Sequence, residues 1–226
     1  MIKTTFARRS LAGHGAVLGL LAAMTGSATA ATAQDSANAE CELHMWSSED
    51  FGSLPFGDGL APALAAMFPG DLSKSVDDQF KSLATANVQL DAVKRADPVS
   101  MFALPAGTRI ITHNDTEDQK VTRSRKGRRS DSAASCYYEL HVVSHYLIED
   151  IVWGDRFTTD FEFRSYSTNA QWDFRHQGEG GNKLTVFPVK PTDDPAQAIT
   201  KVAEAIKANF GEYAPKVARA KARRKR

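Results

Sequence analysis

The sequence CYYELHV at residues 136–142 repeats the opening of an earlier segment, CELHMW at residues 41–46. Both segments alternate apolar and polar residues and contain residue types that favour extended chain, which predicts two β-strands. If these strands are neighbours in a sheet, the two cysteines lie close together. The similarity is confined to the cysteine and a Glu-Leu-His triplet, so chance is an alternative explanation for it.

The chain of 226 residues contains two cysteines, Cys41 and Cys136. Two cysteines in one small domain usually pair in an oxidising compartment. A bridge between them closes a loop of about 95 residues and contributes about 4–5 kcal/mol through chain entropy, before native strain is subtracted. Metal binding and a catalytic thiol are the alternatives, but two cysteines alone bind metal poorly and no activating histidine can be placed. We therefore predict a structural disulfide.

The first 33 residues have the layout of a Sec-type signal peptide. A basic start is followed by a mildly apolar run, Leu11–Met24, and then by two Ala-x-Ala cleavage sites ending at Ala30 and Ala33. The run is about 14 residues long, whereas a membrane span needs about 20, so a membrane anchor is the weaker interpretation. Arg8 and Arg9 form an incomplete twin-arginine motif, and we favour the Sec route. The sequence thus predicts a periplasmic or secreted protein without a transmembrane span in its mature chain.

Charge is distributed unevenly along the predicted mature chain. Residues 34–215 carry a net charge of −9, while the last eleven residues, 216–226, contain seven basic residues and no acid. The near-neutral net charge of +1 for the whole chain hides this contrast between an acidic body and a basic tail. The hydrophobic fraction of 42% excludes a wholly disordered chain.

The order of the predicted elements indicates an α+β fold. We expect an antiparallel β-meander packed with N-terminal and C-terminal helices, in a single domain at 34–215 after the signal peptide. The predicted strands are 41–47, 109–113, 136–146, 157–166, 170–176 and 183–187. The predicted helices are 60–68, 73–95 with a break near 85–87, and one that starts at Asp194 and Pro195 and stops at Gly211. Segments 48–59 and 114–135 are predicted loops, and the glycine-rich segment 178–181 is a predicted turn.

No catalytic residue and no cofactor is predicted, because the chain lacks a Gly-x-Ser-x-Gly elbow and a phosphate-binding loop. His44 and His141 are candidates for a metal site, with Glu139 and His145, if the first strand pairs nearby. His141 and His145 are expected on one face of a strand about 13 Å apart, too far for a single ion. The favoured alternative is a row of polar residues on the solvent face of the sheet. A cluster of carboxylates leaves a hydrolase open as a further alternative: Glu149, Asp150, Asp155 and Asp160.

Two basic runs are candidates for binding a polyanion. The first lies in the loop at 114–135 and contains Lys120, Arg123, Arg125, Lys126, Arg128 and Arg129. The second is the tail, with Lys216, Arg219, Lys221, Arg223, Arg224, Lys225 and Arg226. Outside the cytosol the available polyanions are lipid headgroups, lipopolysaccharide and acidic polymers. Nucleic acid is not expected, because no aromatic residues interleave with these charges. A solvated segment without a partner is the alternative.

Both cysteine-containing segments, Cys41–His44 and Cys136–Leu140, resemble a group of uncharacterised exported proteins of Gram-negative bacteria. The region 136–213 is also similar, at the level of the fold, to envelope proteins with the curli-secretion-lipoprotein or TolB N-terminal fold; Ile151–Trp153 and the helix from Pro195 carry this likeness. Neither resemblance implies an activity.

Together these observations predict an exported protein that acts as a non-catalytic cell-envelope accessory or binding module. Its expected partners are anionic envelope components or another envelope protein. A small secreted hydrolase and a protein that binds polyanions or lipopolysaccharide through its basic segments are the alternatives.

Overall fold

The computed structural model of the chain describes residues 41–54, 78–148, 156–184 and 194–224. All of them belong to one compact unit, residues 38–226. The predicted signal peptide at 1–33 and the predicted helix at 60–68 lie outside the described residues. Within the described ranges, no helix is both long and apolar enough to cross a membrane.

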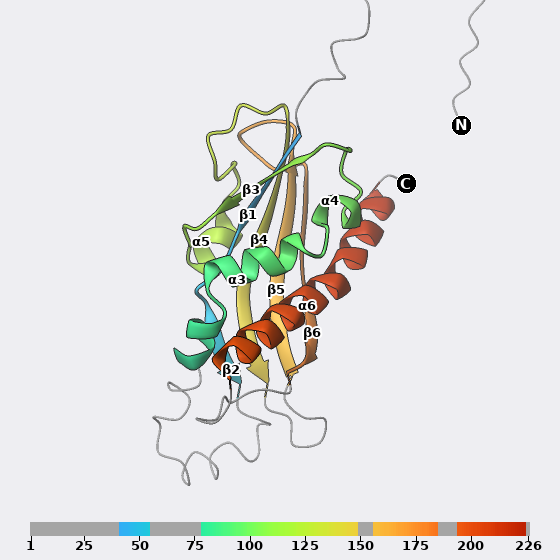
Figure 1. The fold of residues 1–226 in the computed structure, drawn as a ribbon. Helices are drawn as coiled ribbons and strands as arrows, with labels where there is room; N and C mark the ends of the chain where they lie inside the picture. Colours follow the sequence, from blue (N-terminus) through green and yellow to red (C-terminus); the bar gives the residue numbers. More distant parts are fainter. Residues whose placement is uncertain (1–40, 55–77, 149–155, 185–193, 225–226) are drawn as a thin grey trace, which may run out of the picture. The chain divides into compact units, whose positions relative to one another are not determined.

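A six-stranded mixed sheet forms the centre of the fold, and helices pack on it (Figure 1). Its strands are β1 (Cys41–Trp46), β2 (Phe51–Leu54), β3 (Arg109–His113), β4 (Cys136–Ile148), β5 (Arg156–Tyr166) and β6 (Phe174–Lys183). The order across the sheet is β3-β1-β4-β5-β6, and β2 pairs with β4 beyond the end of β1. The predicted α+β class and single domain are confirmed.

The predicted antiparallel meander is correct for β4, β5 and β6 and wrong for the rest of the sheet. Strand β1 runs parallel to both of its neighbours, β3 and β4, and β2 runs parallel to β4. Parallel neighbours need a crossover connection, and helix α3 (Ala86–Lys94) lies in the connection between β1 and β3. The alternation of apolar residues identifies a strand but does not give its direction.

The two cysteines are opposite each other in the pairing of β1 with β4. Their Cα atoms are 4.5 Å apart, and the predicted disulfide between Cys41 and Cys136 is present. The disulfide therefore joins two strands that are 95 residues apart in sequence at the point where both begin.

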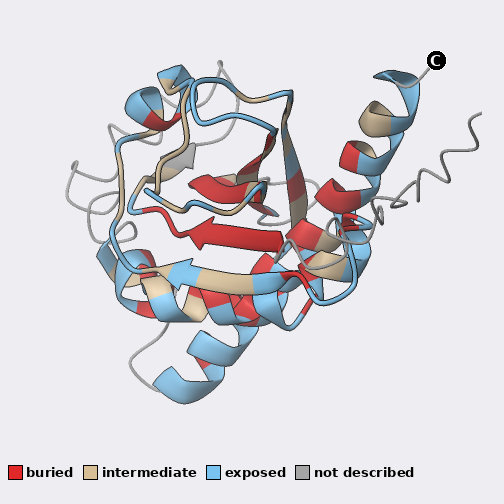
Figure 2. Cartoon of the chain, turned by 90° about the horizontal axis from the view of Figure 1, so that it is seen from above, coloured by how far each residue is buried: buried red, intermediate tan, exposed pale blue. Residues whose placement is uncertain are grey.

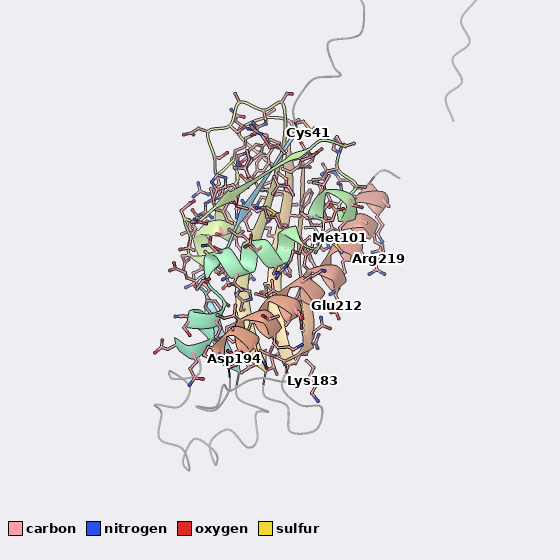
Figure 3. The ribbon with its side chains drawn as sticks, viewed as in Figure 1. Cys41, Met101, Lys183, Asp194, Glu212 and Arg219 are labelled. Atoms are coloured by element: carbon pink, nitrogen blue, oxygen red, sulfur yellow. A yellow bond between two sulfur atoms is a disulfide. The ribbon has the colours of Figure 1, made fainter. Side chains whose placement is uncertain are left out.

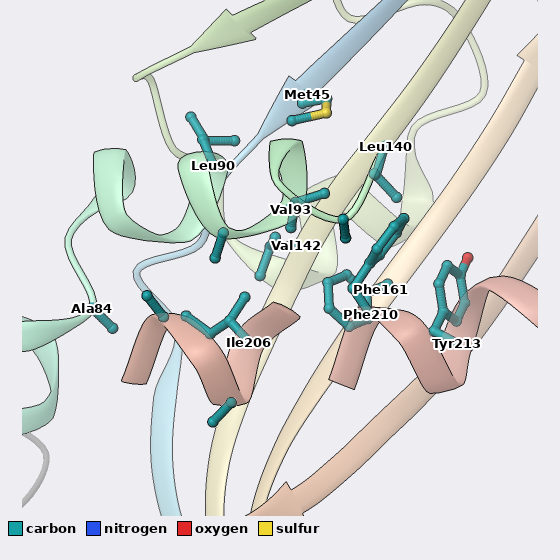
Figure 4. Close-up of a cluster of buried hydrophobic side chains, with 14 of the residues drawn as sticks. Met45, Ala84, Leu90, Val93, Leu140, Val142, Phe161, Ile206, Phe210 and Tyr213 are labelled. Carbon is teal, nitrogen blue, oxygen red and sulfur yellow. The ribbon is translucent and has the colours of Figure 1, made fainter. Parts of the chain in front are cut away.

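Four helical segments lie together on one face of the sheet. They are residues 78–83, α3, α4 (Pro98–Met101) and α6 (Pro195–Arg224). The predicted helix at 73–95 is interrupted at residues 84–85, close to the break predicted near 85–87. Buried apolar side chains from this layer meet the inward side chains of the strands, as in the cluster of Leu90, Val93, Ile206, Phe210, Leu140 and Phe161 (Figure 4). Buried residues concentrate on the strands and on the inner sides of the helices (Figure 2).

Helix α6 begins at Pro195 as predicted but does not stop at Gly211. It continues through Pro215 to Arg224, so residues 216–224 of the predicted basic tail are helical. The reason is tertiary packing: Tyr213, Ala214 and Val217 continue the buried stripe of the helix past the glycine. Burial of this stripe outweighs the cost of a glycine and a proline inside the helix.

The glycine-rich segment 178–181 is not a turn, because β6 runs through it without interruption. A Cβ atom placed on Gly180 would lie 1.8 Å from the carbonyl oxygen of Asn209 on α6. Glycine thus allows the helix backbone to approach the strand closely. In the same place the side chain of Asn209 donates hydrogen bonds of 3.0 Å to the Phe157 carbonyl and to the Thr159 hydroxyl, which fastens α6 to β5.

Side chains of α6 also bond to the backbone of β6, which lies at an edge of the described sheet. The Gly181 N–H donates to the Glu212 carboxylate at 3.1 Å, and the Lys216 ammonium donates to the Glu179 carbonyl. Glu212 is labelled on α6 in Figure 3. Backbone groups of the edge strand are thereby satisfied from within the chain.

Two further elements and one boundary differ from the prediction. Strand β2 and helix α5 (Gln119–Ser124) occur inside segments predicted as loops, and β6 starts at Phe174 rather than at residue 170. Both unpredicted elements are short, and β2 is fixed by its pairing with β4, which is not visible in local sequence. The last predicted strand, 183–187, lies mainly outside the described residues.

We expect Gly180→Ala to destabilise the fold and Gly211→Ala to stabilise it. The first substitution places a methyl group against the α6 backbone and should cost about 1–3 kcal/mol, as overpacking does. The second adds a methyl group that meets nothing within 4 Å and should add about 0.5–1 kcal/mol of helix stability. Urea unfolding of both variants measures these changes. Equal stability of Gly180→Ala and the parent chain would contradict the close approach of α6 to β6.

Candidate functional site

The sheet face opposite the helices carries a dense group of polar and aromatic side chains. They come from alternate positions of four strands, as strand geometry requires. This polar face consists of Glu42, His44, Trp46, Arg109, His113, Tyr137, Glu139, His141, Glu162, Arg164 and Tyr166. It is not the solvent face that was predicted: Glu139, Glu162 and Arg164 are each 0% exposed.

Arg164 is the central charge of the polar face. Its Nε donates to Glu162 at 2.6 Å, and its Nη1 donates to Glu139 at 3.4 Å. Arg175, on β6, donates through Nε to the same Glu162 at 2.7 Å. Two buried carboxylates are thus balanced by two guanidinium groups, the condition under which buried charges are tolerated.

Glu139 is ionised although it is buried. Burial raises the pKa of its carboxyl, but the hydrogen bond from His141, the Arg129 N–H at 2.6 Å and the positive charge of Arg164 bring the pKa down to about 2. Burial lowers the pKa of His141, so its ring is neutral and donates from Nε2 to Glu139 at 3.0 Å.

A second chain of hydrogen bonds runs along β1 towards the edge strand β3. The Glu42 carboxylate bonds to His44 Nε2 at 2.9 Å, and His44 Nδ1 bonds to His113 Nε2 at 2.8 Å. Glu42 also accepts bonds from Arg109 and from the Ser132 hydroxyl. Burial raises the pKa of Glu42, and these partners lower it to about 2. Burial and the charge of His44 lower the pKa of the half-buried His113.

Trp46 lies between two histidines at the middle of the polar face. Its ring is 4.4 Å from that of His113 and 4.8 Å from that of His141, with the planes within 8° of parallel in both pairs. The guanidinium of Arg129 lies 4.9 Å from the Trp46 ring, and that of Arg128 lies 4.4 Å from the Tyr137 ring. Such cation–π contacts are strengthened by burial.

Residues 114–135 lie over the polar face and form its cover. Main-chain carbonyls of the cover accept hydrogen bonds from side chains of the strands. Arg164 donates to the Thr122 carbonyl, Tyr166 to the Gly127 carbonyl at 3.2 Å, and Arg175 to the Arg123 carbonyl at 2.8 Å. The side of the sheet that was expected to face solvent is therefore closed by the segment that was expected to be a loop.

The arginines of the basic loop make contacts within the chain. Arg123 pairs with Asp160 at 3.0 Å, Arg125 with Glu117, and Arg129 with Asp115 at 2.9 Å. Arg128 donates to the carbonyls of Ser132 and Ala134 at 3.0 and 2.9 Å. Lys120 and Lys126 are exposed. The structure thus gives four of the six predicted polyanion-binding residues of this loop a role in the cover.

The basic residues at the end of α6 divide into two groups. Lys216 donates to the Glu179 carbonyl, and Lys221 donates to the Phe102 carbonyl at 3.2 Å, with its ammonium 5.2 Å from the Phe163 ring. Arg219, Arg223 and Arg224 are exposed; Figure 3 labels Arg219. Lys225 and Arg226 lie outside the residues that the structure describes.

The predicted metal candidates do not form a metal site. In the described part of the chain, no group of three or more His, Cys, Asp or Glu residues is arranged to hold an ion. Instead, His44 forms a hydrogen bond with Glu42, and His141 forms one with Glu139. The predicted common face for His141 and His145 is also wrong, because a bulge between Val142 and Ser144 turns the strand.

His145 faces the helices rather than the polar face. It stacks on Phe51 and Phe157, and burial lowers its pKa to about 3. Of the four carboxylates considered for a hydrolase, Glu149, Asp150 and Asp155 lie outside the described residues. Asp160 lines a hollow of about 270 Å³ together with Arg123, Val143, Phe161, Gln177, Gly178 and Glu179.

Sequence reasoning missed His113 and Arg109, and it predicted polyanion binding for Arg128 and Arg129, which lie on the rings of Tyr137 and Trp46. His113 and Arg109 alternate along β3 in the same way as their neighbours Trp46 and Glu42 along β1. That alternation was visible, but the parallel pairing of β3 with β1 was not. The hollow depends on side chains from α5, β5 and β6, so no local motif could have predicted it.

Comparison with known proteins adds little to this description. No protein-family model matches the chain, and no curated protein matches it. Among solved structures, the chain is similar to a hypothetical protein from Chlamydia trachomatis, with 6% sequence identity and a TM-score of 0.36 over 80% of this chain and 95% of that one. At that TM-score the likeness supports no inference about function.

We expect Glu139→Gln to lower the free energy of unfolding at neutral pH and to reduce the loss of stability as pH falls. In the folded protein the pKa of Glu139 is about 2, below its ordinary value of 4.5, so its stabilising effect is present above pH 4.5 and is lost as pH falls towards 2. Removing the charge leaves Arg164 short of a partner and should cost about 3–5 kcal/mol at pH 7.

Urea unfolding between pH 7 and pH 2 measures both effects. Glu204→Gln, on the exposed side of α6, is the control. An unchanged acid limb in Glu139→Gln would contradict an ionised Glu139 in the folded protein.

Proposed function

We propose that the protein is exported and acts in the cell envelope as a binding or accessory module whose partner is an anionic component of the envelope. The observation that carries the binding part is the group of exposed arginines at the end of α6, Arg219, Arg223 and Arg224. Support for export is separate and comes from the N-terminal sequence and the disulfide.

Export is consistent with the covalent bond between β1 and β4. Disulfides persist in oxidising compartments and are rare in the cytosol. The bond between Cys41 and Cys136 joins two strands whose pairing also brings together Glu42, Glu139 and Trp46. An oxidising compartment would thus stabilise the arrangement on which the polar face depends.

The contacts of the polar face favour a structural or binding role over hydrolysis. Its carboxylates form hydrogen bonds with its histidines and with the cover. Glu42 accepts a hydrogen bond from the Ser132 hydroxyl, and Glu139 accepts one from the Arg129 N–H. A general acid or base must instead reach its substrate. The hydrolase alternative therefore requires the cover to move away from Glu42 and Glu139.

The end of α6 has an electrostatic cost that a partner would remove. Arg219 and Arg223 are four residues apart, so their like charges lie side by side and destabilise the helix by a few tenths of a kcal/mol. Their position near the helix C-terminus offsets part of this cost through the helix dipole. Among the described residues neither arginine has a carboxylate partner. Guanidinium groups bind phosphate in a bidentate manner, which points to the phosphate groups of envelope lipids.

We expect the protein recovered from its native cell to lack residues 1–33 or 1–30 and to have no thiol that reacts with an alkylating agent before reduction. Fractionation, intact mass and alkylation with and without reductant measure this. We further expect the Cys41→Ser, Cys136→Ser double variant to lose about 2–5 kcal/mol of stability. An uncleaved cytosolic product with two free thiols would refute export.

We expect the triple variant Arg219→Gln, Arg223→Gln, Arg224→Gln to bind anionic lipid less tightly. Each basic residue near an anionic surface is worth about 1 kcal/mol, so the loss should be on the order of a hundredfold. Co-sedimentation with phosphatidylglycerol vesicles and with lipopolysaccharide at two salt concentrations measures binding and separates the two sources of phosphate.

The matched control replaces three exposed lysines elsewhere, Lys81→Gln, Lys94→Gln and Lys207→Gln, with the same loss of charge. A loss that is equal in both variants would show attraction by net charge only. No binding by the parent protein to either lipid would refute the proposed partner.

A further inference from the structure

The hollow of about 270 Å³ beside β5 and β6 contains charged groups of both signs. Its walls come from helix α5 of the cover, from the bulge of β4, and from the paired strands β5 and β6. Polar side chains at Arg123, Asp160, Gln177 and Glu179 are combined with an apolar lining residue, Val143. A concave site with a few polar groups from different elements has the general form of a small-molecule site.

Asp160 and Glu179 are directly opposite each other in the pairing of β5 with β6. Side chains at such positions are about 5 Å apart at Cβ, and like charges there destabilise a sheet. The pair thus carries a cost in the folded protein that an ordinary surface position would avoid. A cation placed between the two carboxylates would remove it.

The hydrogen bonds in the hollow leave acceptors free for such a cation. Ser144 and Arg123 both donate to Oδ2 of Asp160, each at 3.0 Å, while Oδ1 accepts no bond from the described residues. The Glu179 carboxylate is exposed, and within the described part of the chain it has no ion-pair partner. Gln177 donates from its Nε2 to Glu162, and its Oε1 accepts no hydrogen bond from the described residues.

Arg123 supplies the opposite charge at the same hollow. Its side chain is 44% exposed, and only its Nη2 is engaged with Asp160. The remaining N–H groups of a guanidinium can donate to a second anion in a bidentate manner. The hollow therefore has two carboxylates on one side and a partly free guanidinium on the other.

We propose that this hollow binds a small zwitterion, in which a primary ammonium group lies between Asp160 and Glu179 and an adjacent anionic group bonds to Arg123. The ammonium donates to Oδ1 of Asp160 and to the Glu179 carboxylate, and Val143 contacts the short carbon chain that joins the two charged groups. The site is separate from the arginines of α6 and does not depend on the function proposed for them.

Two sources can provide this chemistry. A phosphoethanolamine group, as in a lipid head, pairs an ammonium with a phosphate, and a free α-amino acid pairs it with a carboxylate. Both fit the arrangement of charges, and they differ in the group that meets Arg123. The fork of a guanidinium matches the geometry of both phosphate and carboxylate. Measured binding of each ligand therefore distinguishes the two sources.

Titration calorimetry of the whole mature protein with O-phosphoethanolamine and with L-alanine tests the proposal, with choline phosphate and ethanol as probes that lack a primary ammonium or any charge. We expect saturable binding of at least one zwitterion and none of the two comparison probes. We expect Asp160→Asn and Glu179→Gln each to weaken binding by about tenfold or more, as loss of a charge-assisted hydrogen bond does.

Because Asp160 also holds the cover through Arg123, Glu179→Gln is the variant that separates binding from folding. Its carboxylate makes no described ion pair and faces the like charge of Asp160, so the variant should unfold at the temperature of the parent or slightly above it. Glu204→Gln is the control for loss of a carboxylate elsewhere and should bind like the parent. Absence of saturable binding by both zwitterions, or equal binding by the parent and Glu179→Gln, would overturn the proposal.

Discussion

The guanidinium of Arg164 is the group on which one half of this structure depends. Arginine keeps its charge under all conditions that a protein survives, and here the side chain is 0% exposed. Glu139 and Glu162 must therefore be ionised beside it, and the Thr122 carbonyl of the cover must accept its remaining nitrogen. Residues 114–135 exclude water from this charge, and their Thr122 carbonyl supplies the acceptor that water would supply on an open face.

The sheet thus has two covers of different physical kind. On one face, helices α3 and α6 bury apolar side chains against β1, β4 and β5, and the contacts depend on shape and area. On the other face, a mostly irregular segment buries ions and aromatic rings, and the contacts depend on pairing of specific atoms. The exposed arginines at the end of α6 and the charged hollow beside β6 lie at the margins of these two covers. The two binding proposals concern these margins.

Local sequence predicted the elements well and their neighbours poorly. Alternation identified β1, β3, β4 and β5, and Asp194 with Pro195 marked the start of α6, because these signals lie within a few residues of one another. The disulfide followed from counting cysteines. The parallel direction of β1 and the stacking of His113 on Trp46 could not be predicted, since each depends on pairing between segments about 70 to 100 residues apart. The cover over Glu139 could not be predicted either, because its contacts are hydrogen bonds of an irregular segment to side chains of several strands. Local sequence predicts a turn at 178–181 because the α6 residue that makes Gly180 necessary, Asn209, lies about 30 residues later.

The contacts that Glu212 and Lys216 make with the backbone of β6 affect how copies of this protein behave near one another. A bare strand edge is a template on which another chain can extend the sheet, and proteins commonly block it with charge. Here a carboxylate and an ammonium from α6 already occupy backbone groups of that edge. Crowded molecules would have to break these internal bonds before joining edge to edge, so the packing of α6 also protects the protein against aggregation.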